Sequence, residues 1–383
     1  MRAHLWFILF CLLGFAGTAA EIQAQQPTRL ETPRETQFRG GITRSGAFDS
    51  PALLEAPILR WQFPMRRPVR MTPAVADGKV FIGGEDGRLF ALDASTGDVV
   101  WRFDAEGSVV SSPVVSNGRL YFGSLDTYFY ALNARTGQLL WRYRTGGQIY
   151  SSPALFANLL YFGSRDRTMY ALSLEGDLTW SKVTSGEIWS SPAIADGQVI
   201  IGDTDGMLYA FDTRYGTSRW TAEVGSTRAT PVISGRVIYI AGGENRLSAA
   251  ALATGEILAT TQVGTDGIEA SVALGDDSLF LIAMDGTLQR LTFNPESPAS
   301  FSLDWETNIG GPAYSSPSYA DGVIYVVTEA GGLLYAFDAQ TGTELWRYQT
   351  GQQGDWRAST PVLVDGVLFI GSDTEGVLAL EGG

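Results

Sequence analysis

The chain has almost none of the side chains that carry out nucleophilic and redox chemistry. Its 383 residues include one cysteine, Cys11, and one histidine, His4. Both lie within residues 1–20, which we expect to be a secretory signal, so the rest of the chain has neither residue type. This shortage excludes disulfides, thiolate or imidazole metal sites, His-based catalytic triads and c-type haem attachment from residues 21–383.

Long apolar runs are also missing. At the N-terminus, Arg2 precedes a short apolar run, Leu5–Phe15, and small residues follow at Thr18–Ala20. These features are typical of a cleaved signal, and the run is too short to span a bilayer comfortably. A retained membrane anchor is the alternative. We do not expect lipidation at Cys11, because Phe10 precedes it where a lipoprotein signal needs a small residue. We expect an exported protein of the periplasm or cell envelope, or a secreted one, that is not integral to the membrane.

Positive charge and helical periodicity are scarce as well. The chain has 27 Lys and Arg residues against 41 Asp and Glu, a formal net charge of −14. Such a chain repels phosphate backbones, so we expect no nucleic-acid partner. Beyond residue 20 no long stretch places apolar residues 3.6 apart, which predicts almost no helix.

What the chain has in abundance is one repeated pattern, seen clearly in residues 111–143. Four short apolar runs, rich in β-branched and aromatic residues, are separated by three turn signals. Asn117-Gly118 marks the first turn, because a type I′ hairpin needs positive φ at both central residues. Four antiparallel strands cannot bury both faces alone, so copies of the unit must stack.

Two markers count the copies. A Pro after Ser or Thr recurs every 39 to 45 residues, with Val272 in one slot. A Trp recurs in the outer strand, with Leu258 in the slot between Trp220 and Trp305. We expect these Trp residues to pack between neighbouring units. By this count the unit at about 268–307 diverges: it lacks both markers, and its third turn is lengthened by residues 294–298.

The markers predict an all-β, eight-bladed β-propeller of four-stranded antiparallel blades. The eighth unit has only three strands, whereas an extra outer strand at 58–63 precedes the first. We therefore expect the N-terminal strand to complete the last blade and leave no free sheet edge. The domain organisation we expect is a signal peptide at 1–20, a flexible leader at 21–56 and the propeller at 57–383.

The pattern SSPxVxxGxxYFGSxDxxxYALxAxTGxxxWxY resembles the quinoprotein (PQQ-like) β-propeller repeat, over about residues 57–380. The preceding segment, Phe38-Arg39-Gly40 to Arg44-Ser45-Gly46, looks like one that often precedes this propeller in secreted bacterial proteins. The resemblance implies one of three kinds of protein. They are quinoprotein dehydrogenases with pyrroloquinoline quinone and Ca²⁺, BamB-like scaffolds of outer-membrane assembly, and secreted repeat proteins without defined activity.

This chain departs from the enzymes more than from the scaffolds. The enzymes carry a vicinal Cys pair and pocket-building insertions, and neither these nor their Ca²⁺-ligand motifs are found here. BamB-like scaffolds match better in length, blade number and compartment, although the lipidation Cys is missing. We therefore expect no cofactor, with pyrroloquinoline quinone and Ca²⁺ as the alternative.

Candidate site residues lie three positions before each Pro slot, where the chain should face the mouth of the central channel. Trp356 and Arg357 stand just before the last slot. Exposed aromatic and Arg side chains are typical of binding hot spots. The alternative is that the aromatics pack on neighbouring blades and the Arg residues pair with nearby carboxylates. Glu269 could pair with Arg70 or Arg228, contact a ligand or act as a general base. The eight slot residues are Arg70, Val110, Tyr150, Trp189, Arg228, Glu269, Tyr314 and Ala358.

We therefore expect a non-enzymatic propeller that engages an envelope protein partner through one face of the ring. A quinone-dependent dehydrogenase and a carbohydrate-binding propeller are the alternatives, and a small-molecule ligand stays open. Asp203-Thr204-Asp205 has the carboxylate spacing of a Ca²⁺ loop but lies in a predicted hairpin without the later Glu, so we expect turn chemistry there.

Overall fold

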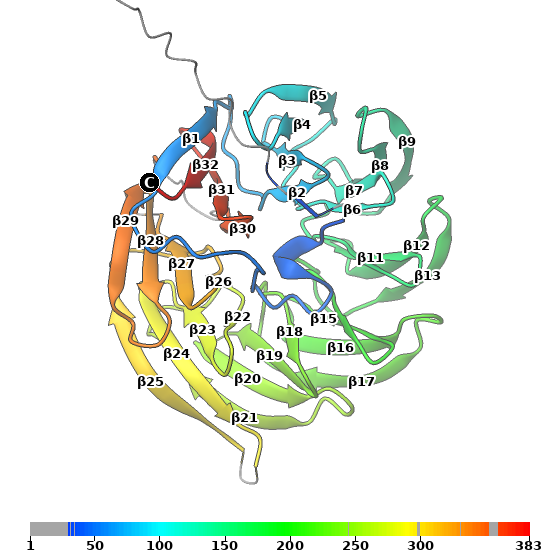
Figure 1. The fold of residues 1–383 in the computed structure, drawn as a ribbon. Helices are drawn as coiled ribbons and strands as arrows, with labels where there is room; N and C mark the ends of the chain where they lie inside the picture. Colours follow the sequence, from blue (N-terminus) through cyan, green and yellow to red (C-terminus); the bar gives the residue numbers. More distant parts are fainter. Residues whose placement is uncertain are drawn as a thin grey trace, which may run out of the picture.

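A computed structural model describes residues 30, 32–33, 35–243, 245–296, 299–329, 331–351 and 359–383. The expected signal segment and the candidates Trp356, Arg357 and Ala358 lie outside the described residues. In the described part, eight four-stranded antiparallel sheets form a ring of blades around a central channel (Figure 1). The predicted all-β, eight-bladed propeller is confirmed. None of the described residues forms a helix long and apolar enough to cross a membrane.

Blades one to seven each run from an innermost to an outermost strand in chain order. Blade one holds β2 (Ala74–Ala76), β3 (Lys79–Gly83), β4 (Arg88–Asp93) and β5 (Val99–Asp104). Blade two holds β6 (Val114–Ser116), β7 (Arg119–Gly123), β8 (Tyr128–Asn133) and β9 (Leu139–Arg144). Blade three holds β10 (Ala154–Phe156), β11 (Leu159–Ser164), β12 (Thr168–Ser173) and β13 (Leu178–Val183). Blade four holds β14 (Ala193–Ala195), β15 (Gln198–Gly202), β16 (Met207–Asp212) and β17 (Ser218–Glu223).

The second half of the ring repeats this plan. Blade five holds β18 (Val232–Ser234), β19 (Val237–Gly242), β20 (Arg246–Ala251) and β21 (Ile257–Gln262). Blade six holds β22 (Ala273–Leu274), β23 (Leu279–Ile282), β24 (Thr287–Asn294) and β25 (Ser300–Asn308). Blade seven holds β26 (Ser318–Ala320), β27 (Val323–Val327), β28 (Leu333–Asp338) and β29 (Glu344–Gln349). Blade eight holds β30 (Val362–Val364), β31 (Val367–Ser372), β32 (Gly376–Glu381) and β1 (Ile58–Phe63).

The two ends of the chain close the ring together. Strand β1 pairs antiparallel with β32, so that Trp61 stands opposite Ala379. In Figure 1 the blue N-terminal strand lies beside the red C-terminal strands. The outer strand of blade eight therefore comes from the N-terminus, as the repeat phase predicts, and β32 is not left as an open edge.

The outer-strand Trp residues join neighbouring blades. Trp101 is buried, and its indole N–H donates to the carbonyl of Ala134 in the next blade at 3.0 Å. The same bond links Trp141 to Leu174 at 2.9 Å and Trp305 to Ala339 at 3.1 Å. The expected packing of the Trp residues between blades is confirmed, and each bond also satisfies a turn carbonyl.

Blade five, and not blade six, lacks the outer-strand Trp. Ala259 stands opposite Ala249 where Trp101 stands opposite Ala91, so the slot belongs to Ala259 and the assignment to Leu258 was wrong by one residue. Blade six keeps its Trp, Trp305. What blade six lacks is the Pro, replaced by Val272, and the two markers are lost in neighbouring blades.

The segment before β1 is a belt (residues 32–33 and 35–53) that touches every blade. It contains the short 3-10 helix η1 (Phe38–Gly40) and lies over the hairpin ends of the inner strands, where for example the Asp77 N–H donates to Pro33 at 2.7 Å. The belt residues bonded to blades one to eight are, in that order, Pro33, Thr36, Gln37, Ile42, Thr43, Ser45, Gly46 and Ser50.

The belt differs from the flexible leader expected for residues 21–56. Arg39 is 1% exposed and Arg44 is fully buried. The Leu53 carbonyl of the belt accepts the indole N–H of Trp346 in blade seven. For Trp101, Trp141 and Trp305 the acceptor is instead a carbonyl in a turn of the next blade. Blade eight has no such turn because its outer strand begins a separate stretch of chain, and the belt provides the missing carbonyl.

Candidate functional site

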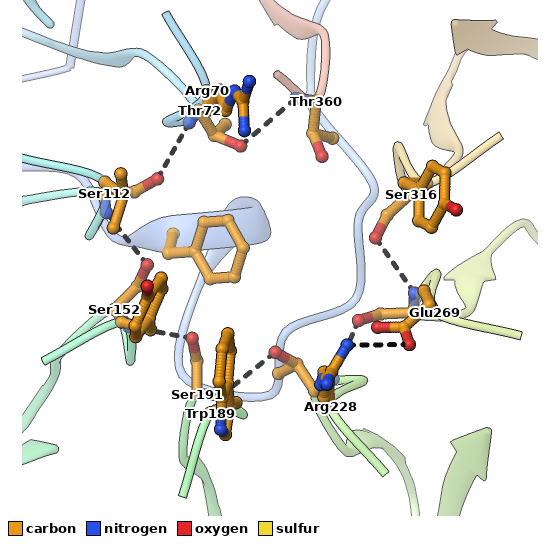
Figure 2. A pocket seen from close by; sticks show the side chains of 16 residues that line it. Arg70, Thr72, Ser112, Ser152, Trp189, Ser191, Arg228, Glu269, Ser316 and Thr360 are labelled. Atoms are coloured by element: carbon orange, nitrogen blue, oxygen red, sulfur yellow. Dashed lines mark hydrogen bonds and ion pairs between the residues drawn. The ribbon is translucent and has the colours of Figure 1, made fainter. Parts of the chain in front are cut away.

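A central pocket opens at the end of the channel opposite the belt. The pocket is lined by Phe38 of the belt, by the candidate residues and by one hydroxyl residue from every blade (Figure 2). It encloses about 670 Å³ of empty space, including the solvent at its mouth. The candidates lie in the loops that lead into the inner strands rather than in the strands. Those that line the pocket are Arg70, Val110, Tyr150, Trp189, Arg228, Glu269 and Tyr314.

The structure brings four of these candidates into one cluster on blades three to six. The rings of Tyr150 and Trp189 stack with centroids 4.3 Å apart. The Arg228 guanidinium lies 4.7 Å from the Trp189 ring centroid and 3.2 Å from a Glu269 carboxylate oxygen. Glu269 thus pairs with Arg228, one of the two partners expected for it, and all four side chains are half-buried.

A second arginine supports the same cluster. Arg165 lies 4.9 Å from the Trp189 centroid and donates to Glu187 at 2.8 Å. Glu187 also accepts the Trp189 indole N–H at 2.9 Å. The hydrogen bond from Arg165 holds the pKa of Glu187 below its usual value. The cluster is therefore a rigid, charge-paired aromatic surface at the pocket mouth.

The other candidates stand apart from this cluster. Arg70, on blade one, forms ion pairs with Glu85 at 3.2 Å and with Asp373 at 3.9 Å. Val110 and Tyr314 line the same pocket. The sequence placed these residues around one opening, but it could not show that only one arc of the ring is aromatic.

Below the mouth, one Ser or Thr from each blade forms the hydroxyl ring. Seven hydrogen bonds run around it, each from the backbone N–H of one member to the hydroxyl oxygen of the member in the next blade, at 2.8–3.3 Å (Figure 2). All members are 3–9% exposed. The members are Thr72, Ser112, Ser152, Ser191, Thr230, Ser271, Ser316 and Thr360.

The two belt arginines lie just beneath the hydroxyl ring. Arg44 donates to the carbonyls of Pro153 and Pro192, each at 2.8 Å, and these residues follow ring members. Arg39 donates to the carbonyl of Val272, which also follows a ring member. Within the described structure neither guanidinium has a carboxylate partner. Burial lowers the pKa of Arg39 to about 9, and burial together with the neighbouring Arg39 charge lowers the pKa of Arg44 to about 9, so both remain charged at neutral pH.

The members of the hydroxyl ring follow a pattern that is visible in the sequence. The second Ser of each SSP motif is a ring member, and so is the Thr before Pro73, Pro231 and Pro361. Arg39 and Arg44 belong to the segment noted for its resemblance. Their burial could not be predicted, because isolated Arg residues in a polar leader ordinarily remain in solvent.

The described residues offer no carboxylate set for a quinone with Ca²⁺ or for a Ca²⁺ loop. Among the described residues that line the pocket, Glu269 is the only carboxylate, and Arg228 already pairs with it. No group of three or more His, Cys, Asp or Glu side chains in the described ranges could hold a metal ion. The Asp203 carboxylate instead accepts bonds from the backbone N–H of Met207 and Gly186 and from the Tyr209 hydroxyl, so it organises its turns.

Comparisons with known proteins agree with this architecture. The family described as outer membrane protein assembly factor BamB matches residues 58–148, 114–294 and 297–382. The BamB of Burkholderia pseudomallei is 29% identical over 133 residues, which are 34% of this chain and 33% of that protein. The chain thus aligns with about a third of that relative's length.

Solved structures share the fold. The crystal structure of BamB from Moraxella catarrhalis has a TM-score of 0.69 at 17% identity, over 85% of this chain and 98% of that one. The quinohemoprotein alcohol dehydrogenase from Comamonas testosteroni has a TM-score of 0.75 at 14% identity, over 91% of this chain and 81% of that one. These likenesses show a propeller shared by a scaffold and an enzyme, and nothing of activity. The family match, in contrast, extends over nearly the whole ring, and this chain belongs to the family of outer membrane protein assembly factor BamB.

Proposed function

We propose that this protein is a non-enzymatic scaffold of the bacterial cell envelope that holds a protein partner at the mouth of its central pocket. The family membership supports a role in outer-membrane assembly and a location in the periplasm or envelope. The observation that carries the choice of face is the stacked Tyr150–Trp189 pair between two charge-paired arginines. Trp, Tyr and Arg held rigidly at a half-buried surface are the residue types that dominate binding energies.

The belt supports the same face. It covers the hairpin ends of the inner strands, so the opposite end of the channel is the one where side chains of all the inner loops meet at an opening. Burying a preorganised aromatic surface costs little side-chain entropy, because stacking and ion pairs already fix its rotamers. A partner segment that covers Trp189 would therefore gain most of its binding energy there.

Affinity capture from envelope extract with the tagged full chain tests this proposal. Trp189→Ala should reduce recovery of outer-membrane assembly proteins by about tenfold or more, since truncating a hot-spot residue costs at least about 2 kcal/mol. Tyr215→Ala is the matched control, because Tyr215 is an exposed aromatic that also contacts an arginine but lies in a blade-four turn away from the pocket. Equal recovery with wild type and Trp189→Ala would show that the partner uses another face.

The same surface argues against the two alternatives. A sugar would have to displace Tyr150 or a guanidinium to stack on Trp189. A Ca²⁺-bound quinone lacks its carboxylate ligands in the described pocket. Pyrroloquinoline quinone with Ca²⁺ should leave the melting temperature of the protein unchanged. A ligand that binds only the native state stabilises it, so a clear rise would instead favour the dehydrogenase hypothesis.

A further inference from the structure

The hydroxyl ring has donors without acceptors. A Ser or Thr hydroxyl offers one O–H donor and two acceptor positions. In seven members the oxygen accepts a neighbour's N–H, yet within the described residues none of the eight hydroxyls donates a hydrogen bond of its own. All eight are more than nine-tenths buried and line one pocket, which Phe38 of the belt also lines, so neighbouring O–H groups are available to one small ligand in that pocket.

The charge beneath the ring has no counter-charge. Arg39 and Arg44 are buried, and among the described residues they donate hydrogen bonds only to carbonyl oxygens, while the Arg44 guanidinium also lies 5.5 Å from the Phe38 ring centroid. One nitrogen of Arg39, Nη1, has no hydrogen-bond partner in the described part of the chain. A buried guanidinium without a carboxylate is costly, and two close together are more so, because charges attract and repel strongly where water is excluded.

Both features call for the same ligand. The Arg44 carbonyl partners, Pro153 and Pro192, directly follow ring members, so the two charges lie about one residue below the ring of donors. An anion in the pocket would accept neighbouring O–H groups and offset part of the charge of the arginines beneath Phe38. A neutral ligand would do only the first, and a cation would do neither.

We propose that the hydroxyl ring binds one small monovalent anion, either free chloride or a carboxylate group, above the belt arginines. Glu269, the carboxylate at the pocket mouth, does not supply it, because it is paired with Arg228 at 3.2 Å. The proposal stands without the scaffold function, since a free anion needs no partner protein. A carboxylate presented by a bound chain is the second source of the same chemistry.

The test uses the purified full chain and ³⁵Cl NMR in sodium chloride. Exchange of chloride with the ring should broaden the ³⁵Cl line, and bromide should reverse the broadening. Acetate and neutral acetamide, equal in size, separate the two sources. If acetate reverses the broadening and acetamide does not, the ring takes carboxylates; if neither does, it takes free halide. Reversal by acetamide would contradict an anion site.

Two variants and one control place the site. Thr360→Val removes a hydroxyl that accepts no bond, and Ser152→Ala removes one that does. Each should weaken chloride binding about tenfold, as for the loss of a hydrogen bond to a charged group. Ser318→Ala, the control, removes a buried hydroxyl that donates to Pro361 outside the pocket and should leave the broadening unchanged.

Crystals of the wild-type protein soaked in sodium bromide locate the anion site without any variant. Wild-type protein should show an anomalous bromine peak inside the ring of eight hydroxyls. A bromine peak found only elsewhere, or broadening that persists equally in all three variants, would overturn the proposal.

Discussion

The outer-strand Trp residues join the blades by a hydrogen bond from the indole N–H as well as by side-chain packing. The N–H reaches across the blade boundary to a turn carbonyl, and in Trp101 this is the only donor to Ala134 among the described contacts. At Trp220 the same bond is shared, because the Gln198 side chain also donates to the Leu252 carbonyl, at 3.2 Å. The two sites therefore differ in what is left after the indole is removed.

Trp101→Phe should lower the free energy of unfolding by about 1–3 kcal/mol, because a turn carbonyl loses its only donor. Trp220→Phe makes the same change in side-chain size but leaves Gln198 in place, so its loss should be smaller by about 1 kcal/mol. Urea denaturation followed by tryptophan fluorescence measures both. Equal losses would mean that packing, and not the hydrogen bond, joins the blades.

Single residues also mark the limit of what the sequence predicts. Tyr150, Trp189 and Arg228 all line the central pocket, because a repeat of constant length returns the same position to the same place. Arg39 and Arg44 have no equivalents in the repeat, so no periodicity pointed to their burial. The Trp slot of blade five was misplaced by one residue because Ala259 carries no signal of its own.

At the scale of the blade, turns and neighbouring blades fit each other. Asn117-Gly118 has φ of +50° and +71°, as the predicted type I′ hairpin requires. Gly137 ends the third turn at φ +73°, and a Cβ built there would lie 2.6 Å from the Trp101 ring. Gly137 is thus required both for its backbone conformation and for the close approach of the preceding blade.

Gly137→Ala and Gly118→Ala separate these two requirements. Both place Ala at nearly the same positive φ, but a Cβ at Gly118 meets nothing within 4 Å. Gly137→Ala should therefore cost about 1–3 kcal/mol more, the usual penalty for overpacking. Differential scanning calorimetry compares the two, and equal melting temperatures would show that the Trp101 ring moves aside freely.

Blades five and six show how an element compensates for a missing residue. Where Ala259 replaces the outer Trp, β24 and β25 extend further than in other blades, and Phe293 and Phe301 pack against Tyr239 at centroid distances of 5.6 and 6.4 Å. The sequence pattern placed the lengthened turn and the absent Trp in one unit, whereas the structure places the absent Trp in blade five and the lengthened strands in blade six. Their connection depends on which blades are adjacent in space, which the markers alone did not resolve.

At the scale of the whole molecule, the short belt connects all the blades of the ring. It bonds to all eight blades in order and supplies Leu53 to Trp346 at the last junction. Blade number and ring closure were predictable from the phase of the repeat. The path of the belt was not, because a polar segment without alternation gives no information about where it lies.

Removing residues 1–56 should lower the melting temperature by about 10 °C, since several buried hydrogen bonds are lost at once and each kcal/mol shifts a protein of this size by a few degrees. Removing residues 1–29 is the control, because it leaves the belt intact. Circular dichroism melting of both truncations makes the comparison. A belt that merely rests on the ring would leave the two curves superimposed.

The pairing of β1 with β32 has a consequence for biosynthesis. A ribosome releases β1 first and β32 last, so the last blade stays incomplete until the chain is finished. Contacts so distant along the chain form late, because the entropy of closing the intervening loop must first be overcome. A truncated product would expose β1 and an uncovered belt, and so would differ from the finished ring in the features that proteases and chaperones recognise. The ring therefore gains its resistance to degradation only after β32 has been synthesised.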